Sequence, residues 1–199
     1  MVKIYEIFLF LYTMSDKFND KYRIKSARLE GYDYRNEGLY YVTICTKNRT
    51  NFFGECNDGI MLLNDLGKLA EDCWLAIPTH FPNVSLDEFT IMPNHIHGIV
   101  CINEKIEIER TSVETYNYTT LQMQKNPHFQ KLSAPAKSLS TIIRAFKTVV
   151  TTESRKINPN FAWQQRFHDH IIRDAQSFEN IKKYIINNPK NWITDEYYL

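Results

Sequence analysis

Two histidines separated by one residue stand at positions 95 and 97, in the strand-forming segment MPNHIHGIVCIN. Because side chains alternate along a β-strand, both imidazoles would project from one face while Ile96 enters the other. Such a pair can chelate one divalent cation. The competing interpretation is two polar residues on the exposed face of a sheet, and the spacing by itself leaves both open.

A second pair of chemically capable side chains lies near the C-terminus, in KKYIINNP. Asn188 follows Tyr184 by four positions, so a helix would place a phenol and an amide on the same face, one turn apart. The alternative is that Tyr184, one of 12 tyrosines, only packs its ring against a sheet. Lys182 and Lys183 beside it could contact phosphates or be simply solvated.

Positive charge gathers in the C-terminal third of a chain whose formal net charge is only +1. Between Lys137 and Trp192 there are ten lysines or arginines against four acidic residues. This excess is typical of a face that contacts phosphates, but a solvated helix surface would also produce it. Arg144 and Lys147, on the polar side of an amphipathic segment, are candidate contacts to a nucleic-acid backbone.

The elements that must position these residues can be read from hydrophobic periodicity and breaker residues. A strand is expected over 39–47, a turn and short strand over 57–65, a helix over 64–78 that Pro78 ends, and a hairpin turning at 92–94. Another amphipathic helix begins at Ser138, and a last one spans about 175–188 with Asp174 as N-cap. The stretch 161–174, FAWQQRFHDHIIRD, is aromatic, basic and extended.

This order of elements favours an α+β fold, a ferredoxin-like or RRM-like sandwich with a central, mostly antiparallel sheet and helices on one face. We expect an N-terminal extension at 1–22, a catalytic domain at 23–192 and a C-terminal tail at 193–199. Residues 104–136 are polar and lack a steady period, so they are expected to form an inserted arm.

The composition is that of a globular chain: 199 residues, 43% hydrophobic and 14% aromatic. The apolar opening MVKIYEIFLFLYTM has no cleavage site and is too short to span a bilayer; Met14 is an alternative start, or the segment adds an edge strand. Four scattered cysteines without a CxxC pair fit a reducing compartment. We therefore expect a cytoplasmic protein with no membrane partner.

Three blocks in a fixed order, MPNHIHGI, WQQRFHDHIIRD and YIINNP, resemble the single-tyrosine HUH transposases, the group that includes the REP-associated tyrosine transposases and the smallest insertion-sequence transposases. The resemblance covers roughly residues 28 to 192. It includes RLEGYDYRNEGLYYVTICTKNR, which is similar to the first-strand region of the family. Compared with better-known members, the arm at 104–136 is extra.

The resemblance implies metal-dependent cleavage and strand transfer of single-stranded, hairpin-containing DNA, carried out by a homodimer. Tyr184 would be the nucleophile and would form a 5′-phosphotyrosine; His95, His97 and Asn188 would hold Mg²⁺ or Mn²⁺, although imidazole ligands by themselves favour Zn²⁺. Residues of the middle block, Arg166, His170 and Arg173, could contact the DNA or support the active site.

Two rival functions remain open at this point. One is a host-adopted protein that binds DNA hairpins without catalysis, which the intact set of four site residues argues against. The other is a metallohydrolase that uses the two histidines to activate water. That reading lacks an acidic third ligand near the pair, because Asp87 and Glu88 lie across the presumed hairpin, and it leaves Tyr184 without a role.

Overall fold

The computed structural model describes residues 17–18, 21–22, 29, 31–103 and 138–198. The chain divides into two units, 1–32 and 33–199. In the first, strands β1 (Lys17–Phe18) and β2 (Lys21–Tyr22) pair antiparallel. The choice between Met1 and Met14 as the start, and the arm expected at 104–136, lie outside the described residues.

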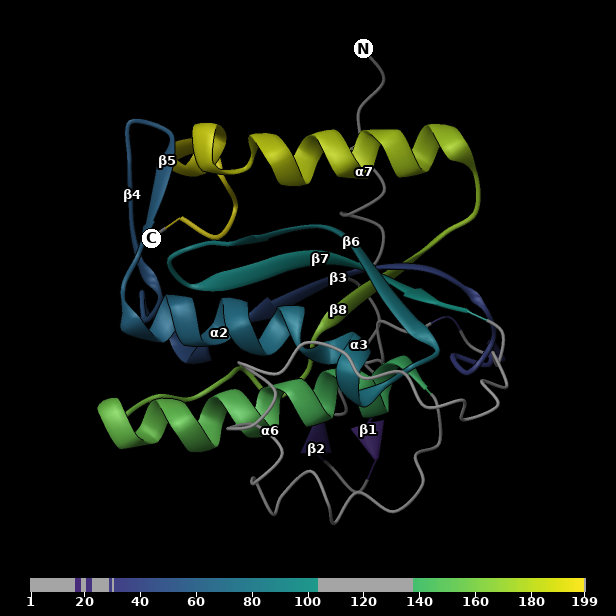
Figure 1. Ribbon diagram of the computed structural model, residues 1–199, viewed down its shortest axis with the longest axis horizontal. Coiled ribbons are helices and arrows are strands. Elements are labelled where there is room, and N and C mark those ends of the chain that lie inside the picture. The colour runs from purple at the N-terminus through teal and green to yellow at the C-terminus, as the bar shows by residue number, and fades with distance from the viewer. Residues whose placement is uncertain (1–16, 19–20, 23–28, 30, 104–137, 199) are drawn as a thin grey trace, which may run out of the picture. The chain divides into compact units, whose positions relative to one another are not determined.

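The second unit is built on one four-stranded sheet in the order β6-β7-β3-β8 (Figure 1). The strands are β6 (Val84–Ile91), β7 (His95–Ile102), β3 (Gly38–Cys45) and β8 (His168–Ile172). Each neighbouring pair runs antiparallel. The α+β class with an antiparallel central sheet is thereby confirmed, and the strands expected at 39–47 and around the turn at 92–94 are both present.

Helices α2 (Asp65–Leu75) and α6 (Leu139–Ile157) cover one face of this sheet. The buried Trp74 of α2 packs directly on β7 at Gly98, where an added Cβ would lie 2.3 Å from the indole ring. Only glycine leaves room for the indole there. The expected helix over 64–78 is split: α2 ends at Leu75 and a short helix α3 (Ile77–His80) follows, with Pro78 in its first turn, where proline is tolerated.

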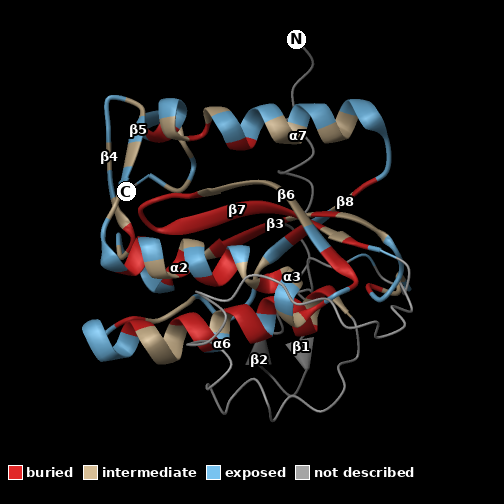
Figure 2. Cartoon of the chain, viewed as in Figure 1, coloured by how far each residue is buried: buried red, intermediate tan, exposed pale blue. Residues whose placement is uncertain are grey.

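Helix α7 (Ala175–Asn187) lies on the opposite face of the sheet (Figure 1). Its Ile185 packs with Ile99 of β7 and Ile172 of β8. The expectation that all helices share one face is therefore corrected. Strands β3 and β7 are buried on both faces (Figure 2), so their runs of apolar residues serve two helix layers, which a single-face pattern does not reveal.

The described part of the unit also contains one short hairpin and two 3₁₀ helices. Strands β4 (Gly54–Asn57) and β5 (Ile60–Leu63) pair antiparallel, and the 3₁₀ helices are η1 (Lys47–Arg49) and η2 (Pro189–Thr194). All four cysteines are unpaired. Within the described ranges, no helix is both long enough and apolar enough to span a bilayer.

Helix α7 begins where the sequence predicts, because the Asp174 carboxylate accepts a hydrogen bond from the Ser177 backbone N–H at 2.7 Å. Asp174→Ala should lower the free energy of unfolding by about 1 kcal/mol, since one N–H of the first turn loses its partner. Urea unfolding measures this change. Asp174→Asn keeps an acceptor oxygen and is the matched control; an equal loss in both variants would contradict the capping role.

Candidate metal and nucleophile site

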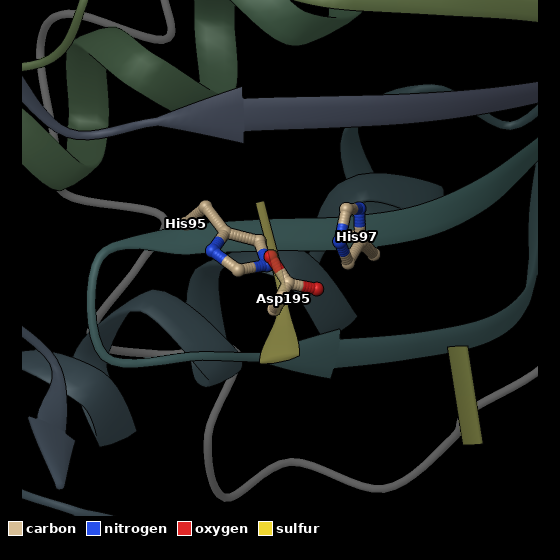
Figure 3. Close-up of side chains that lie close together, drawn as sticks. All are labelled: His95, His97 and Asp195. Carbon is tan, nitrogen blue, oxygen red and sulfur yellow. The ribbon is translucent and has the colours of Figure 1, made fainter. Parts of the chain in front are cut away.

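The two histidines of β7 lie side by side on the strand, with Asp195 beside them (Figure 3). They share the face of the sheet that carries α7, because the Tyr184 hydroxyl of that helix lies 3.4 Å from His97 Nε2. Neither is exposed: His95 and His97 both have 0% of their surface accessible. Their ring centroids are 4.4 Å apart. The strand alternation expected from the sequence therefore brings the two imidazoles together. Because both histidines are buried, the competing interpretation, two polar residues on an exposed sheet face, is excluded.

Helix α7 brings Tyr184 over this pair. The Tyr184 hydroxyl lies 3.4 Å from His97 Nε2 and 3.4 Å from a carboxylate oxygen of Asp195. Tyr184 as a whole residue is 41% exposed. Asn188 caps the C-terminal end of the same helix and is 1% exposed. The four-residue spacing thus places phenol and amide at one site.

Asp195 is the site residue that the sequence analysis missed. It follows η2 in the segment expected to be a tail, and its carboxylate accepts a hydrogen bond from Asn188 Nδ2 at 2.8 Å. One ligand atom each from His95, His97 and Asp195 lie within 4.8 Å of one another (Figure 3). No local spacing signals this residue, because it reaches the histidines only through the fold.

The C-terminal segment is held in place by several contacts. The Arg49 guanidinium lies 5.1 Å from the centre of the Tyr197 ring and donates to the Glu196 carbonyl. The Tyr197 ring in turn lies 4.6 Å from the His95 ring, centre to centre. Residues 195–197 therefore form part of the wall of the site.

Two buried atoms at the site have no hydrogen-bond partner in the structure, His95 Nε2 and Asn188 Oδ1. Both atoms can offer lone pairs. A buried polar atom without a hydrogen-bond partner costs folding free energy. Where native structures contain such atoms, they usually contact an ion or a water molecule, or they take part in function. Together with the Asp195 carboxylate, these atoms form a donor set that suits a divalent cation.

Burial controls the protonation of the site. It lowers the pKa of His95 to about 3, a shift that the neighbouring Asn188 partly offsets, and the pKa of His97 lies well below its usual value for the same reason. Burial also raises the pKa of Tyr184, and the negative charges of Asp195 and Glu196 raise it further. In the absence of a cation both imidazoles are neutral and the phenol keeps its proton.

The two buried histidines make a clear prediction about acid stability. Unfolding returns them to a pKa near 6.5, so below that pH the unfolded chain binds protons that the folded chain does not. The free energy of unfolding of metal-free protein should therefore fall as the pH drops from about 7 towards 5. Urea unfolding at both pH values measures it, and equal stability would show that the two imidazoles take up protons in the fold as readily as in the unfolded chain.

The basic residues predicted to contact DNA divide into two groups. Two are only partly exposed: Lys147 donates from Nζ to the carbonyls of Gln164 and Arg166, at 2.7 and 3.1 Å, and Lys182 pairs with Asp87 at 2.9 Å. Burial lowers the pKa of Lys147 to about 8. The others have exposed side chains: Arg144, Arg166, His170, Arg173 and Lys183.

Comparison with known proteins gives a relative that aligns over most of both chains. A Haemophilus influenzae protein, described as uncharacterized, is 40% identical over 188 residues, which cover 94% of this chain and 99% of the relative. The chain belongs to the family of this Haemophilus protein. No family model matches the sequence.

Comparison with solved structures shows which known fold this chain shares. The structure of a REP-associated tyrosine transposase bound to a REP hairpin aligns with a TM-score of 0.51 and 17% identity, over 82% of this chain and 74% of that one. The fold expected from the sequence resemblance is thereby confirmed. A crystal structure from Deinococcus radiodurans aligns with 14% identity over 80% of this chain and 95% of that one, but its TM-score of 0.40 is too low to establish a shared fold.

Proposed function

We propose that this protein is a metal-dependent single-strand DNA transesterase of the tyrosine transposase type, with Tyr184 as its nucleophile. One observation carries the proposal: the Tyr184 hydroxyl stands within 3.4 Å of both His97 Nε2 and the Asp195 carboxylate. A partly exposed phenol beside a buried cluster of metal-ligand atoms suits attack on a phosphate. The shared fold with a hairpin-bound transposase supports it.

His95, His97 and Asp195 would hold the cation, with the amide oxygen of Asn188 as a further ligand. The unpartnered His95 Nε2 and Asn188 Oδ1 fit this role. Imidazole ligands by themselves favour Zn²⁺, but carboxylate and amide oxygens favour Mg²⁺ or Mn²⁺. A site with two oxygen ligands therefore suits the metals that the resemblance implies. A bound cation would polarise the scissile phosphate and lower the pKa of the nearby phenol.

In the reaction, the Tyr184 oxygen forms a bond to phosphorus and gives its proton to the Asp195 carboxylate. The bond from phosphorus to the 3′ oxygen of the preceding nucleotide breaks, and that oxygen takes up a proton from solvent. The products are a 5′-phosphotyrosine and a free 3′-hydroxyl. The Asp195 carboxylate and His97 are the groups of this chain that face the phenolic proton. Because an ester is exchanged and none is hydrolysed, the hydroxyl of another strand can reverse the step, which transfers the strand without ATP.

The DNA is proposed to be single-stranded and to carry a hairpin. The neighbouring structure was determined with a REP hairpin, which supports this class of partner. The exposed Arg144, Arg166, His170, Arg173 and Lys183 are the candidates for contacts to it. Lys147 and Lys182 are only partly exposed, so we rank them below the exposed group.

Tyr184 reaches the histidines of its own chain, so one chain carries a full set of site residues. We therefore propose that cleavage can occur within a single subunit. The homodimer expected from the resemblance remains a prediction. Light scattering tests it by measuring the molar mass of the protein in solution.

A metallohydrolase is the second candidate, and one specific observation favours it. The acidic ligand that the sequence did not offer near the histidines is present as Asp195. In that case a cation-bound water would be the nucleophile and no covalent intermediate would form. The two candidates thus differ in whether a protein–DNA adduct exists.

The proposal is tested by incubating purified full-length protein with labelled single-stranded oligonucleotides that carry hairpins from the DNA flanking its own gene. We expect an adduct that resists denaturation, formed with Mg²⁺ or Mn²⁺ and lost with a chelator. Cleavage without an adduct would favour the metallohydrolase. Hairpin binding with neither cleavage nor adduct in any metal would favour the non-catalytic binding protein.

A further inference from the structure

Asn94, directly before the histidine pair, is fully buried and makes three side-chain contacts. Its Nδ2 lies 3.1 Å from the carbonyl oxygen of Arg49 and 2.8 Å from the carbonyl oxygen of Tyr197. Its Oδ1 lies 2.9 Å from Nδ1 of His95. The three contacts together determine which way the amide points.

Backbone carbonyls only accept hydrogen bonds, so the group of Asn94 that faces two of them must be the NH₂ group. Its Oδ1 is then the atom beside His95. An amide oxygen also only accepts, which requires that His95 Nδ1 carries the proton. A neutral imidazole that carries its proton on Nδ1 holds a lone pair at Nε2, and His95 Nε2 is a buried atom that has no partner.

We propose that Asn94 is a positioning residue that fixes His95 in the Nδ1–H tautomer, so that the Nε2 lone pair points into the site. The inference rests on the proposed function in so far as a cation uses that lone pair. In the opposite tautomer His95 would present an N–H and could not act as a ligand. Groups that hold the second ring nitrogen of a ligand histidine usually set its tautomer and orientation.

His97 provides a contrast within the same site. Its Nδ1 lies 2.7 Å from the Tyr41 hydroxyl and 3.0 Å from the Thr43 hydroxyl, and hydroxyls can donate as well as accept. These partners orient the His97 ring without dictating which nitrogen carries the proton. Asn94 therefore fixes the tautomer of His95, whereas the hydroxyl partners of His97 Nδ1 leave the tautomer of His97 open.

Asn94 also links the histidine to the C-terminal segment. The same amide that holds His95 donates to Tyr197, two residues after Asp195. One side chain thus sets the tautomer of one proposed ligand and helps place the segment that carries another. A substitution at Asn94 should therefore weaken cation binding in two ways, by releasing the tautomer of His95 and by loosening the segment that carries Asp195.

The test compares full-length wild type, Asn94→Leu, Asn94→Asp and His95→Ala, all metal-free at neutral pH. Long-range ¹H–¹⁵N spectra of histidine-labelled protein report the tautomer directly. Wild type and Asn94→Asp, which keeps an acceptor, should show His95 with the proton on Nδ1; Asn94→Leu should lose that form. Mn²⁺ affinity, measured by titration calorimetry, should fall about 10- to 100-fold in Asn94→Leu.

A wild-type His95 protonated on Nε2 would overturn the inference, as would an Asn94→Leu variant that binds Mn²⁺ as tightly as wild type while His95→Ala does not. If Asn94→Leu fails to fold, the spectra of wild type and Asn94→Asp still decide the tautomer. If His95→Ala binds Mn²⁺ normally, the proposed metal site fails, and the tautomer spectrum separately decides the role of Asn94.

Discussion

Tyr184→Phe is expected to form no covalent adduct with hairpin oligonucleotides, while binding them within about two-fold of wild type. The substitution removes one oxygen, the atom that would bond to phosphorus in the proposed phosphotyrosine. The aromatic ring stays, so its edge contact with the Tyr41 ring, at 6.4 Å between centres, can be retained. Denaturing gels detect the adduct and a binding titration measures affinity.

Tyr198→Phe is the matched control, because Tyr198 has an exposed side chain in the same C-terminal region and removing its hydroxyl should leave adduct formation unchanged. Continued cleavage by Tyr184→Phe at the wild-type rate would reject the tyrosine mechanism. It would favour the metallohydrolase, which needs the histidines and Asp195 but has no use for this phenol.

His97→Ala is expected to reduce the rate of adduct formation by about a thousand-fold or more. The change removes a proposed metal ligand, and stabilisation of transition-state charge by a cation contributes several kcal/mol, with each 1.4 kcal/mol worth about a factor of ten. His97 Nε2 is also one of the atoms nearest the Tyr184 hydroxyl. Single-turnover cleavage in saturating Mn²⁺ measures the rate.

His80→Ala provides the comparison, since it removes an imidazole from α3, outside the group of residues that could hold a metal. Its rate should match wild type. If high Mn²⁺ concentrations restored His97→Ala fully, the defect would be in affinity alone. A His97→Ala variant with wild-type activity at low Mn²⁺ would contradict the assignment of the cation to this histidine pair.

The local features of this fold follow closely from the sequence. The amphipathic pattern after Ser138 gives α6, Asp174 caps α7, and the turn at 92–94 joins β6 to β7. Each depends on residues within one or two turns of each other, and capping, periodicity and strand alternation act at that range. For the same reason the sequence correctly predicts that His95 and His97 share one face.

The position of Lys147 shows where local patterns stop being informative. It lies on the polar side of an amphipathic helix, which predicts a solvated or phosphate-binding lysine. In the fold its ammonium group donates to two carbonyls of the 161–167 segment and stacks near Trp163. Those partners lie 17 and 19 positions away, and nothing in the helix periodicity specifies them.

The sequence by itself therefore determines the elements of this protein and the identities of four candidate site residues, His95, His97, Tyr184 and Asn188. Tertiary structure alone decides that the histidines are buried, that α7 faces α2 and α6 across the sheet, and that Asp195 joins the site. Tyr184 meets His97 across 87 positions, and Asn94 meets Tyr197 across 103. Contacts at such separations depend on strand order and layer packing, which are properties of the whole chain.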